Sequence, residues 1–391
     1  MLKIKNGRLI LDKVETKSIY IEGGKIVAIT DEALPFDEEL DANHNYVSAG
    51  FIDTHVHGGG DYDFSDGGAD AFIFASKTHL MHGTTSLCPT LAALPHDTIK
   101  NLISDYKELV AREHKSLPRF LGLHLEGPYL NYSQAGGQPK DNIQNPIKEK
   151  YEELISLGKG YIAKMTLAPE LEGALELCEA LKENGIIVNI GHTEATYEEV
   201  VEAVEAGASC FTHLYSSMST IVRKNSYRVL GTVEAAYMLD GTYVEVIGDG
   251  IHLPPPLLKV ITRFIDEDRI ILISDAMRGA DMPEGPSVLG ARFQGMPCII
   301  EDGIAKIPDR TSFAGSVATA DRLLRTMIKD VGLPIEQAIR YLTVNPARHL
   351  GLSSVGALKE GYLSDVIIFD DNVNIKTVIV GGEIVKNDLI N

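Results

Sequence analysis

The stretch that decides the fold is Gly50-Phe51-Ile52-Asp53-Thr54-His55-Val56-His57-Gly58-Gly59-Gly60, an apolar run that ends in two histidines and then in glycine. Side chains two residues apart in an extended strand point to the same face, so His55 and His57 are expected to project together from the strand end. Two adjacent imidazoles suit a transition metal. A single His-x-His pattern is weak evidence by itself, so the rest of the chain must supply the partners.

The composition limits the class of protein. The chain has 391 residues, of which 44% are hydrophobic, and this favours one large domain with an accessory piece. A formal net charge of −19 argues against a nucleic-acid partner, because phosphate backbones require a basic surface. No apolar run approaches the roughly 18 residues of a membrane span, and the first residues lack the apolar region of a signal peptide. We therefore expect a cytoplasmic protein with no membrane partner.

The four cysteines are far apart and contain no C-x-x-C pair, which argues against a disulfide framework or a structural zinc knot. They are predicted to be buried thiols, at Cys88, Cys178, Cys210 and Cys298.

Both ends of the chain have the pattern of β-hairpins. Two-residue turn signals lie between apolar flanks at Asn6-Gly7 and Gly23-Gly24, and again near the C-terminus at Gly381-Gly382. Isolated hairpins are only marginally stable, so we expect the two ends to pair. The prediction is a small, discontinuous β-sandwich domain from residues 1–49 and 352–391, with residues 50–351 as the main domain.

The main domain alternates short apolar runs with helical patterns. Eight strands are predicted, at residues 51–57, 84–89, 120–126, 161–168, 186–192, 210–215, 243–249 and 270–275. Helices are predicted at residues 69–81, 97–113, 171–183, 196–206, 257–265 and 319–331, while the connections near 147–157 and 218–238 are harder to interpret. Thr196-x-x-Glu199 is a capping box, and Gly207 is expected to end that helix. Eight alternations favour an α/β fold of the (β/α)8 TIM-like barrel type over a doubly wound sheet.

Ionisable side chains gather where these strands are predicted to end. In a (β/α)8 barrel the carboxyl ends of the strands hold the chemistry, so the side chains are expected to meet at one mouth. Four histidines with one or two carboxylates form a nitrogen and oxygen ligand set that suits Zn, Fe, Co or Mn. The residues concerned are His55 and His57, Glu126, His192, His213, Asp249 with His252, and Asp275.

A series of motifs then carries a family resemblance. The start of the first strand resembles the amidohydrolase superfamily. Within it, the chain resembles the N-acetylglucosamine-6-phosphate deacetylase family through His124-Leu125-Glu126-Gly127-Pro128, Thr166-Leu167-Ala168-Pro169-Glu170, Gly191-His192-Thr193, Thr212-His213-Leu214, Asp249-Gly250-Ile251-His252, Ser274-Asp275-Ala276 and Asn345-Pro346-Ala347-Arg348. The resemblance runs nearly from end to end and includes the split β domain.

The resemblance implies a role for each ionisable group. Glu126, His192 and His213 would hold the principal divalent metal ion, and His55 and His57 would hold a second ion beside it. Asp275 would be the general base that takes a proton from water and returns it to the departing amine, or alternatively a further metal ligand. One or two ions are expected, because some relatives lack the two histidines of the first strand.

The same resemblance implies the substrate contacts, and here the chain departs from the family. His252 and the backbone of Phe313, Ala314 and Gly315 would contact the sugar or its phosphate. The usual Gly-Ala-His is replaced by Gly136, Gly137 and Gln138, and the usual Asn-Ala by Ser216 and Ser217. In relatives an arginine reaches the phosphate across a dimer. Arg223, Lys224 or Arg228 would serve in this chain if it is a homodimer, unless these are solvated loop charges.

The implied function is hydrolysis of the N-acetyl group of an amino-sugar phosphate, with N-acetylglucosamine 6-phosphate as the leading substrate. A galactosamine epimer, or an N-acyl compound without phosphate, remains open because of Gln138 and Ser216. A second hypothesis is a cyclic-amide hydrolase, for which Lys164 would have to bridge two metals as a carboxylated lysine. A third is a non-catalytic scaffold. The β-like stretch from Asp281 to Pro308 is expected to be scaffold.

Overall fold

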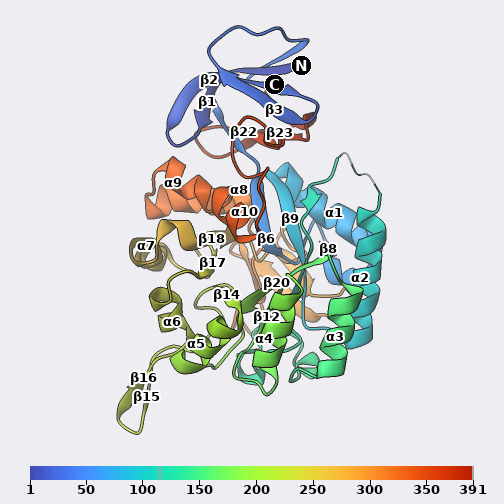
Figure 1. Cartoon of the computed structure of the whole chain (residues 1–391), viewed down its shortest axis with the longest axis vertical. Coiled ribbons are helices and arrows are strands. Elements are labelled where there is room, and N and C mark those ends of the chain that lie inside the picture. The colour runs from blue at the N-terminus through green and yellow to red at the C-terminus, as the bar shows by residue number, and fades with distance from the viewer. Residues whose placement is uncertain (113, 115, 390–391) are drawn as a thin grey trace.

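The computed structural model describes residues 1–112, 114 and 116–389, and its centre is a barrel of parallel strands (Figure 1). In spatial order the strands are β6 (Phe51–Val56), β9 (Thr84–Leu91), β11 (Leu123–Glu126), β12 (Ile162–Leu167), β13 (Ile187–Ile190), β14 (Ala208–Phe211), β17 (Tyr243–Ile247) and β18 (Ile270–Ile273). The barrel closes where the backbone N–H of Asp275, just after β18, donates to the carbonyl of His55 on β6 at 2.9 Å. The predicted (β/α)8 barrel is confirmed, and a doubly wound sheet is not formed.

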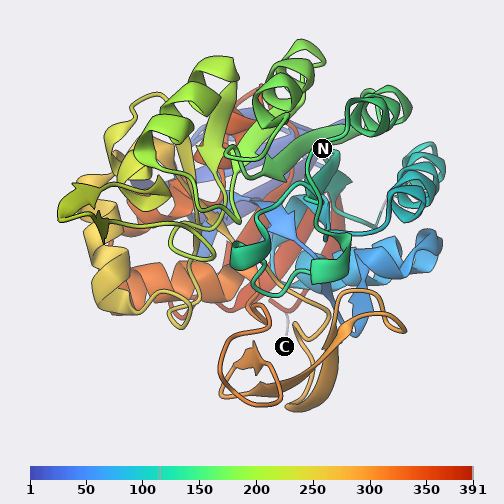
Figure 2. The same ribbon diagram turned by 90° about the horizontal axis from the view of Figure 1, so that it is seen from below.

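Helices surround the barrel, as the view onto its lower end shows (Figure 2). They are α1 (Gly68–Met81), α2 (His96–Val110), α3 (Lys148–Leu157), α4 (Ala174–Glu183), α5 (Tyr197–Ala206), α6 (Thr232–Met238), α7 (Pro255–Phe264), α8 (Ala320–Thr326), α9 (Ile335–Arg340) and α10 (Val344–His349). A π-helical turn, η5 (Met327–Val331), extends α8. The helix predicted to reach Glu113 ends at Val110, and Glu113 lies outside the described residues.

The capping box at the start of α5 is confirmed. The Thr196 hydroxyl accepts the N–H of Glu199 at 3.4 Å, and the Glu199 carboxylate accepts the N–H of Thr196 at 2.8 Å. Gly207 ends the helix in a left-handed conformation, with φ of 130°. These local bonds fix where α5 begins and ends, and therefore how β13 and β14 are joined.

The strands of the two chain ends form one sheet above the barrel (Figure 1). They are β1 (Leu2–Ile10), β2 (Val14–Glu22), β3 (Lys25–Thr30), β4 (Glu38–Asp41), β5 (Tyr46–Ala49), β22 (Val366–Phe369), β23 (Ile375–Val380) and β24 (Glu383–Asn387). The sheet has its own buried apolar cluster, which includes Ile4, Leu9, Ile368 and Ile379. The predicted small β domain is therefore formed from both chain ends, and its strands are hydrogen-bonded into a single sheet.

Two of the three predicted hairpin turns are confirmed. Gly23-Gly24 joins β2 to β3, and Gly381-Gly382 joins β23 to β24, with positive φ at all four glycines. The turn predicted at Asn6-Gly7 is wrong, because β1 continues through it with a β-bulge. Asn6 bonds Asp41 of β4 at 2.8 Å, and a Cβ on Gly7 would lie 2.4 Å from Val47, so this segment is held against its neighbours.

Shorter elements complete the chain. The stretch after β18 forms an antiparallel sheet of β19 (Gly285–Leu289), β20 (Met296–Glu301) and β21 (Ile304–Lys306) beside the lower end of the barrel (Figure 2). The connection after β14, which the sequence pattern did not resolve, contains an exposed hairpin of β15 (Val222–Lys224) and β16 (Tyr227–Val229). The hairpin projects from the barrel (Figure 1). The remaining short elements are β7 (Gly58–Gly59), β8 (Tyr62–Asp63), η1 (Phe64–Asp66), β10 (Arg119–Phe120), η2 (Tyr132–Gln134), η3 (Lys140–Asn142) and η4 (Glu267–Arg269). Among the described residues, no helix is long and apolar enough to cross a membrane.

Candidate metal centre and active site

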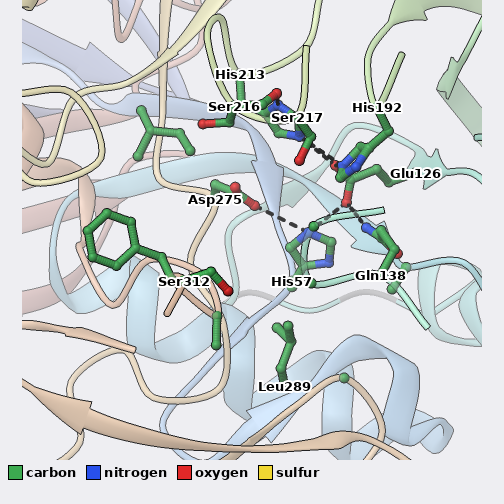
Figure 3. A pocket seen from close by; sticks show the side chains of 18 of the residues that line it. His57, Glu126, Gln138, His192, His213, Ser216, Ser217, Asp275, Leu289 and Ser312 are labelled. Atoms are coloured by element: carbon green, nitrogen blue, oxygen red, sulfur yellow. Dashed lines mark hydrogen bonds and ion pairs between the residues drawn. The ribbon is translucent and has the colours of Figure 1, made fainter. Parts of the chain in front are cut away.

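Six ionisable side chains from five strands converge at the carboxyl end of the barrel, and Figure 3 labels all of them except His55. His55 lies on β6 and Glu126 ends β11, while the others follow the last residue of their strands by one or two positions. The four histidines and Glu126 are all buried. The residues are His55, His57, Glu126, His192, His213 and Asp275.

The first group is Glu126 with His192 and His213. Oε1 of Glu126 lies 3.1 Å from Nε2 of His192 and 2.9 Å from Nε2 of His213, and the two Nε2 atoms are 3.1 Å apart. Nδ1 of His192 faces the carbonyl of Gln134 at 2.8 Å, and Nδ1 of His213 faces the carbonyl of Ser216 at 3.1 Å. A carbonyl only accepts, so each Nδ1 carries the proton and each neutral imidazole directs an Nε2 lone pair inward.

Three electron-pair donors therefore converge with no hydrogen between them. Such an arrangement is repulsive unless a cation lies among the atoms, and imidazole and carboxylate are ligands of divalent transition metals. Glu126, His192 and His213 lie close enough to hold one ion, and so do His55, His57 and Glu126. The donor set fits a metal centre in which Glu126 belongs to both groups.

The second group lies on the other side of Glu126. Nε2 of His57 is 3.1 Å from Oε2 of Glu126, and Nε2 of both His55 and His57 is 3.3 Å from Oδ1 of Asp275. Burial would lower the pKa of His55, but the negative charges of Glu126 and Asp275 prevail and raise the pKa to about 9. In the absence of metal, protons on these imidazoles would balance the carboxylates.

The two carboxylates are held in the charged form. Burial would raise the pKa of Glu126, but the positive charge of His55 outweighs this effect and brings the pKa well below its ordinary value. The pKa of Asp275 is lowered in the same way, by His55 and His57 against the effect of burial. The side chain of Asp275 is therefore an ionised carboxylate at neutral pH.

A buried ion pair lies inside the barrel behind these groups. Lys164 of β12 bonds Glu245 of β17, and both side chains are fully buried. Glu245 also accepts hydrogen bonds from Thr54 at 2.8 Å and from Asn189 at 3.3 Å, and its second oxygen lies 3.6 Å from Nδ1 of His55. The amine of Lys164 is therefore engaged by Glu245.

A cavity of about 250 Å³ opens over the metal-binding groups. One side is formed by His57, Glu126, His192, His213 and Asp275. The opposite side is uncharged and is formed by Ile247, Leu289, Ser312, Phe313 and neighbouring backbone. Among the described residues that line it, none is an arginine or a lysine.

The sequence profile of the amidohydrolase family matches residues 46–385. The chain belongs to the amidohydrolase family. It is 31% identical to an N-acetylglucosamine-6-phosphate deacetylase of Lysinibacillus sphaericus, over 95% of this chain and 93% of that protein. It is 30% identical to an N-acetylgalactosamine-6-phosphate deacetylase of Escherichia coli O157:H7, over 95% of both chains.

A solved structure of a related deacetylase is similar to this chain over nearly its whole length. The N-acetyl-D-glucosamine-6-phosphate deacetylase of Mycobacterium smegmatis superposes with a TM-score of 0.89 at 29% identity, over 99% of both chains. That protein was solved as an aspartate-to-alanine mutant in complex with N-acetyl-D-glucosamine-6-phosphate. The family resemblance predicted from the motifs is confirmed.

The cavity of this amidohydrolase brings together most of the residues that the sequence suggested for substrate contact. Gly137, Gln138, Ser216, Ser217, His252, Phe313, Ala314 and Gly315 all line it. Nδ1 of His252 bonds the carboxylate of Asp249 at 2.8 Å, and the His252 ring lies 5.1 Å from the ring of Phe313. The Asp249 bond leaves Nε2 of His252 as the nitrogen available to a ligand.

Three predicted contacts do not lie at this cavity. Arg223, Lys224 and Arg228 belong to the β15–β16 hairpin, where their side chains are exposed, and none of them lines the cavity of its own chain. A contact with substrate from these residues would have to come from another copy of the chain.

The expectation that the stretch from Asp281 to Pro308 is only scaffold is incomplete. Leu289 ends β19 and lines the cavity together with Gly290. Arg278 holds this loop in place, because its buried guanidinium donates to the carbonyls of Val288 at 3.0 Å and Gly290 at 2.6 Å. The sequence did not reveal the place of Leu289 at the cavity, because Arg278 bonds backbone carbonyls, which every residue has, and no side-chain pattern marks such a contact.

The sequence did contain a signal for the buried pair. Lys164 and Glu245 are charged residues inside otherwise apolar strands, at Ile162–Leu167 and Tyr243–Ile247. A charged side chain in a fully buried strand needs a partner of opposite sign. Two such strands in one barrel predict the pair that forms.

Proposed function

We propose that this chain hydrolyses the N-acetyl group of an amino-sugar phosphate, with N-acetylglucosamine 6-phosphate as the leading substrate. The observation that carries the proposal is the pair of overlapping ligand groups that share Glu126, beside the partly buried carboxylate of Asp275. Relatives of both the glucosamine and the galactosamine type match nearly the whole chain. The products would be acetate and the free amine.

We assign Glu126, His192 and His213 to the principal divalent ion, and His55 and His57 with Glu126 to a second. A bound ion supplies Lewis acidity, which polarises the amide carbonyl and lowers the pKa of water from 15.7 toward ~7. The metal is one of Zn, Fe, Co or Mn, since the ligands are imidazole and carboxylate.

In this proposal Asp275 carries the proton. Its oxygen lies between His55 and His57 at 3.3 Å from each Nε2, and the lowered pKa keeps it ionised. It would accept a proton from the attacking water and deliver it to the nitrogen of the amide, because an amine leaves far more readily than its anion. His252, oriented by Asp249, would contact the substrate from the opposite side of the cavity.

The alternative cyclic-amide hydrolase is not supported by the position of Lys164. A carboxylated lysine would have to reach the metal groups, whereas the amine of Lys164 bonds Glu245 inside the barrel. Glu126 already lies between both groups of histidines. The complete ligand set also gives no support to a non-catalytic scaffold.

The test is release of acetate by the metal-loaded protein from a panel of compounds. The panel contains the 6-phosphates of N-acetylglucosamine and N-acetylgalactosamine, unphosphorylated N-acetylglucosamine and one cyclic amide. We expect turnover of a phosphorylated sugar, reduced about 10²- to 10⁴-fold by Asp275→Asn, which removes the proton acceptor. The proposal fails if neither phosphorylated sugar yields acetate.

A further inference from the structure

One short segment, residues 134–138, contacts two of the proposed metal ligands. The carbonyl of Gln134 accepts the Nδ1 proton of His192 at 2.8 Å. The side-chain amide of Gln138 donates to Oε2 of Glu126 at 2.6 Å (Figure 3). The segment therefore orients a ligand of each kind, an imidazole and the shared carboxylate.

The orientation of the Gln138 amide is fixed by its two partners. Its Oε1 accepts the backbone N–H of Ala93 at 2.7 Å, while its Nε2 faces Glu126. The N–H of Ala93 can only donate and an ionised carboxylate can only accept, so a flipped amide would lose both bonds. The carbonyl of Ala93 is itself held by Asn142 at 3.0 Å.

The backbone beside Gln138 has little room to move. Gly136 has φ of 55°, and a Cβ there would lie 2.6 Å from the hydroxyl of Ser217. A Cβ on Gly137 would lie 2.6 Å from Leu289. The positive φ of Gly136 favours glycine there, and the side chains of Ser217 and Leu289 pack closely against the segment that carries Gln138.

The carboxylate that Gln138 contacts has two different tasks. Oε1 of Glu126 faces His192 and His213 and lies 3.5 Å from Nε2 of His55, whereas Oε2 faces His57. The terminal torsion of a glutamate is broad, so the carboxylate by itself has no strong preference for this orientation. A hydrogen bond to Oε2 selects it, and still leaves that oxygen a lone pair for an ion.

We propose that Gln138 is a positioning residue, which fixes the orientation of the Glu126 carboxylate between the two groups of histidines, and that contact with substrate is not its main role. This inference rests on the metal centre of the proposed function. Partners that orient a metal ligand typically contribute 10- to 100-fold to metal affinity. The family resemblance implies that this position contacts the substrate instead, and the two roles predict different measurements.

The experiment measures binding of Zn²⁺ to the metal-free full-length protein by calorimetry, with no substrate present. Gln138→Met keeps the length of the side chain and removes both hydrogen bonds. We expect its dissociation constant for Zn²⁺ to rise about 10- to 100-fold. Gln134→Ala is the matched control, because it keeps the carbonyl that holds His192 and removes only a side chain bonded to Glu194.

A second variant and a kinetic measurement keep the outcomes separate. Gln138→Asn retains an amide but is shorter by one methylene, so it provides the test if the methionine variant does not fold. At saturating Zn²⁺ we expect both variants to have a KM within about 2-fold of the parent, because the substrate contact is unchanged. Unchanged Zn²⁺ affinity with a raised KM would overturn the positioning role.

The same data distinguish failure of the inference from failure of the proposed function. If the parent hydrolyses no N-acetylated sugar but Gln138→Met still weakens Zn²⁺ binding, only the function is wrong. If acetate is released normally and Zn²⁺ affinity is unchanged in both variants, only the inference is wrong.

Discussion

At the scale of single residues, the two groups of ligands are not equivalent. The Nδ1 atoms of His192 and His213 are fixed by backbone carbonyls at 2.8 and 3.1 Å, so their Nε2 lone pairs are permanently directed at Glu126. Nδ1 of His55 has only the Glu245 carboxylate, at 3.6 Å, which is too long for a hydrogen bond. The group of His192 and His213 is therefore the better organised before any ion arrives.

This difference predicts the result of removing the other group. The double variant His55→Gln with His57→Asn should bind less metal per chain, because Glu126, His192 and His213 still hold the principal ion. We expect a reduced but measurable activity, roughly 10- to 100-fold below the parent. Metal content is measured by mass spectrometry of the purified protein, and acetate release gives the activity.

The control for this variant is His44→Gln, at an exposed histidine in the turn between β4 and β5 of the small β domain. It should change neither quantity. Full metal content in the double variant would contradict the assignment of His55 and His57 to a second ion.

Much of the candidate metal centre could be predicted at this scale. Few residue types bind metal ions, and here they stand at the ends of strands that alternate regularly with helices. Glu126, His192 and Asp275 were all expected at one mouth. The two hydrogen bonds of the Gln138 side chain, to Glu126 and to Ala93, could not be predicted, since they depend on the orientation of one amide group. A motif gives the position of a residue, and only packing gives its partners.

At the scale of elements, the strand ends differ from expectation in one repeated way. Strands β13, β14 and β18 stop two residues before His192, His213 and Asp275, which all have positive φ, of 49°, 34° and 47°. A left-handed backbone at a residue with a side chain costs roughly 1–3 kcal/mol and is typical of functional sites. The backbone turns at these three residues, so each extended strand ends before them. The apolar pattern of the sequence does not show this turn, and the predicted strands were therefore too long.

At the same scale, an ion pair joins the end of α1 to the start of α8. His82, which follows α1, lies with Nδ1 3.2 Å from Asp321 in the first turn of α8, and Nε2 lies 3.5 Å from Asp281. Burial would lower the pKa of His82, but the hydrogen bond and charge of Asp321 raise it. Asp321 also bonds Arg325 and Thr319, and its own pKa is lowered against burial by His82.

These shifts predict how the stability depends on pH. A histidine whose pKa is raised by folding contributes fully below its unfolded pKa of about 6.5, and the contribution is lost as the pH rises through the folded value. Asp321→Asn should therefore lower the free energy of unfolding by roughly 1 kcal/mol at pH 5.5 and by less at pH 9. Urea denaturation at the two pH values measures the difference.

The variant His82→Gln isolates the charged pair. In its background, Asp321→Asn should cost nearly the same at both pH values, because only the bonds to Thr319 and Arg325 remain. An equal cost at pH 5.5 and pH 9 in the parent background would show that His82 is not the group that titrates.

At the scale of the whole molecule, charge poses a problem for an anionic substrate. The chain carries a net charge of −19, and no described arginine or lysine lines the cavity. A field of this sign disfavours the approach of a phosphate unless local cations oppose it. The exposed cations Arg223, Lys224 and Arg228 lie on the β15–β16 hairpin, which projects away from its own barrel (Figure 1).

We therefore expect these cations to serve the cavity of a second copy in a homodimer. Replacing Arg223, Lys224 and Arg228 by alanine should raise KM for N-acetylglucosamine 6-phosphate roughly 10- to 100-fold, the loss of one or two charge-assisted hydrogen bonds. The kcat should change little, since the metal ligands and Asp275 are untouched. Weak turnover of the unphosphorylated sugar should be unaffected, because it lacks the group that the cations bind.

Mixed dimers decide whether the hairpin acts within its own chain or across to the partner. A chain with Asp275→Asn has no proton acceptor but keeps its hairpin, and the hairpin variant has the opposite defect. If the hairpin acts across the dimer, a mixed dimer contains one cavity with an intact Asp275 and intact cations, so co-refolding the two chains should restore low-KM activity. If the cations act within their own chain, every cavity stays defective and mixing restores nothing. The absence of rescue in dimers shown to be mixed would therefore contradict a contact of these cations across the dimer.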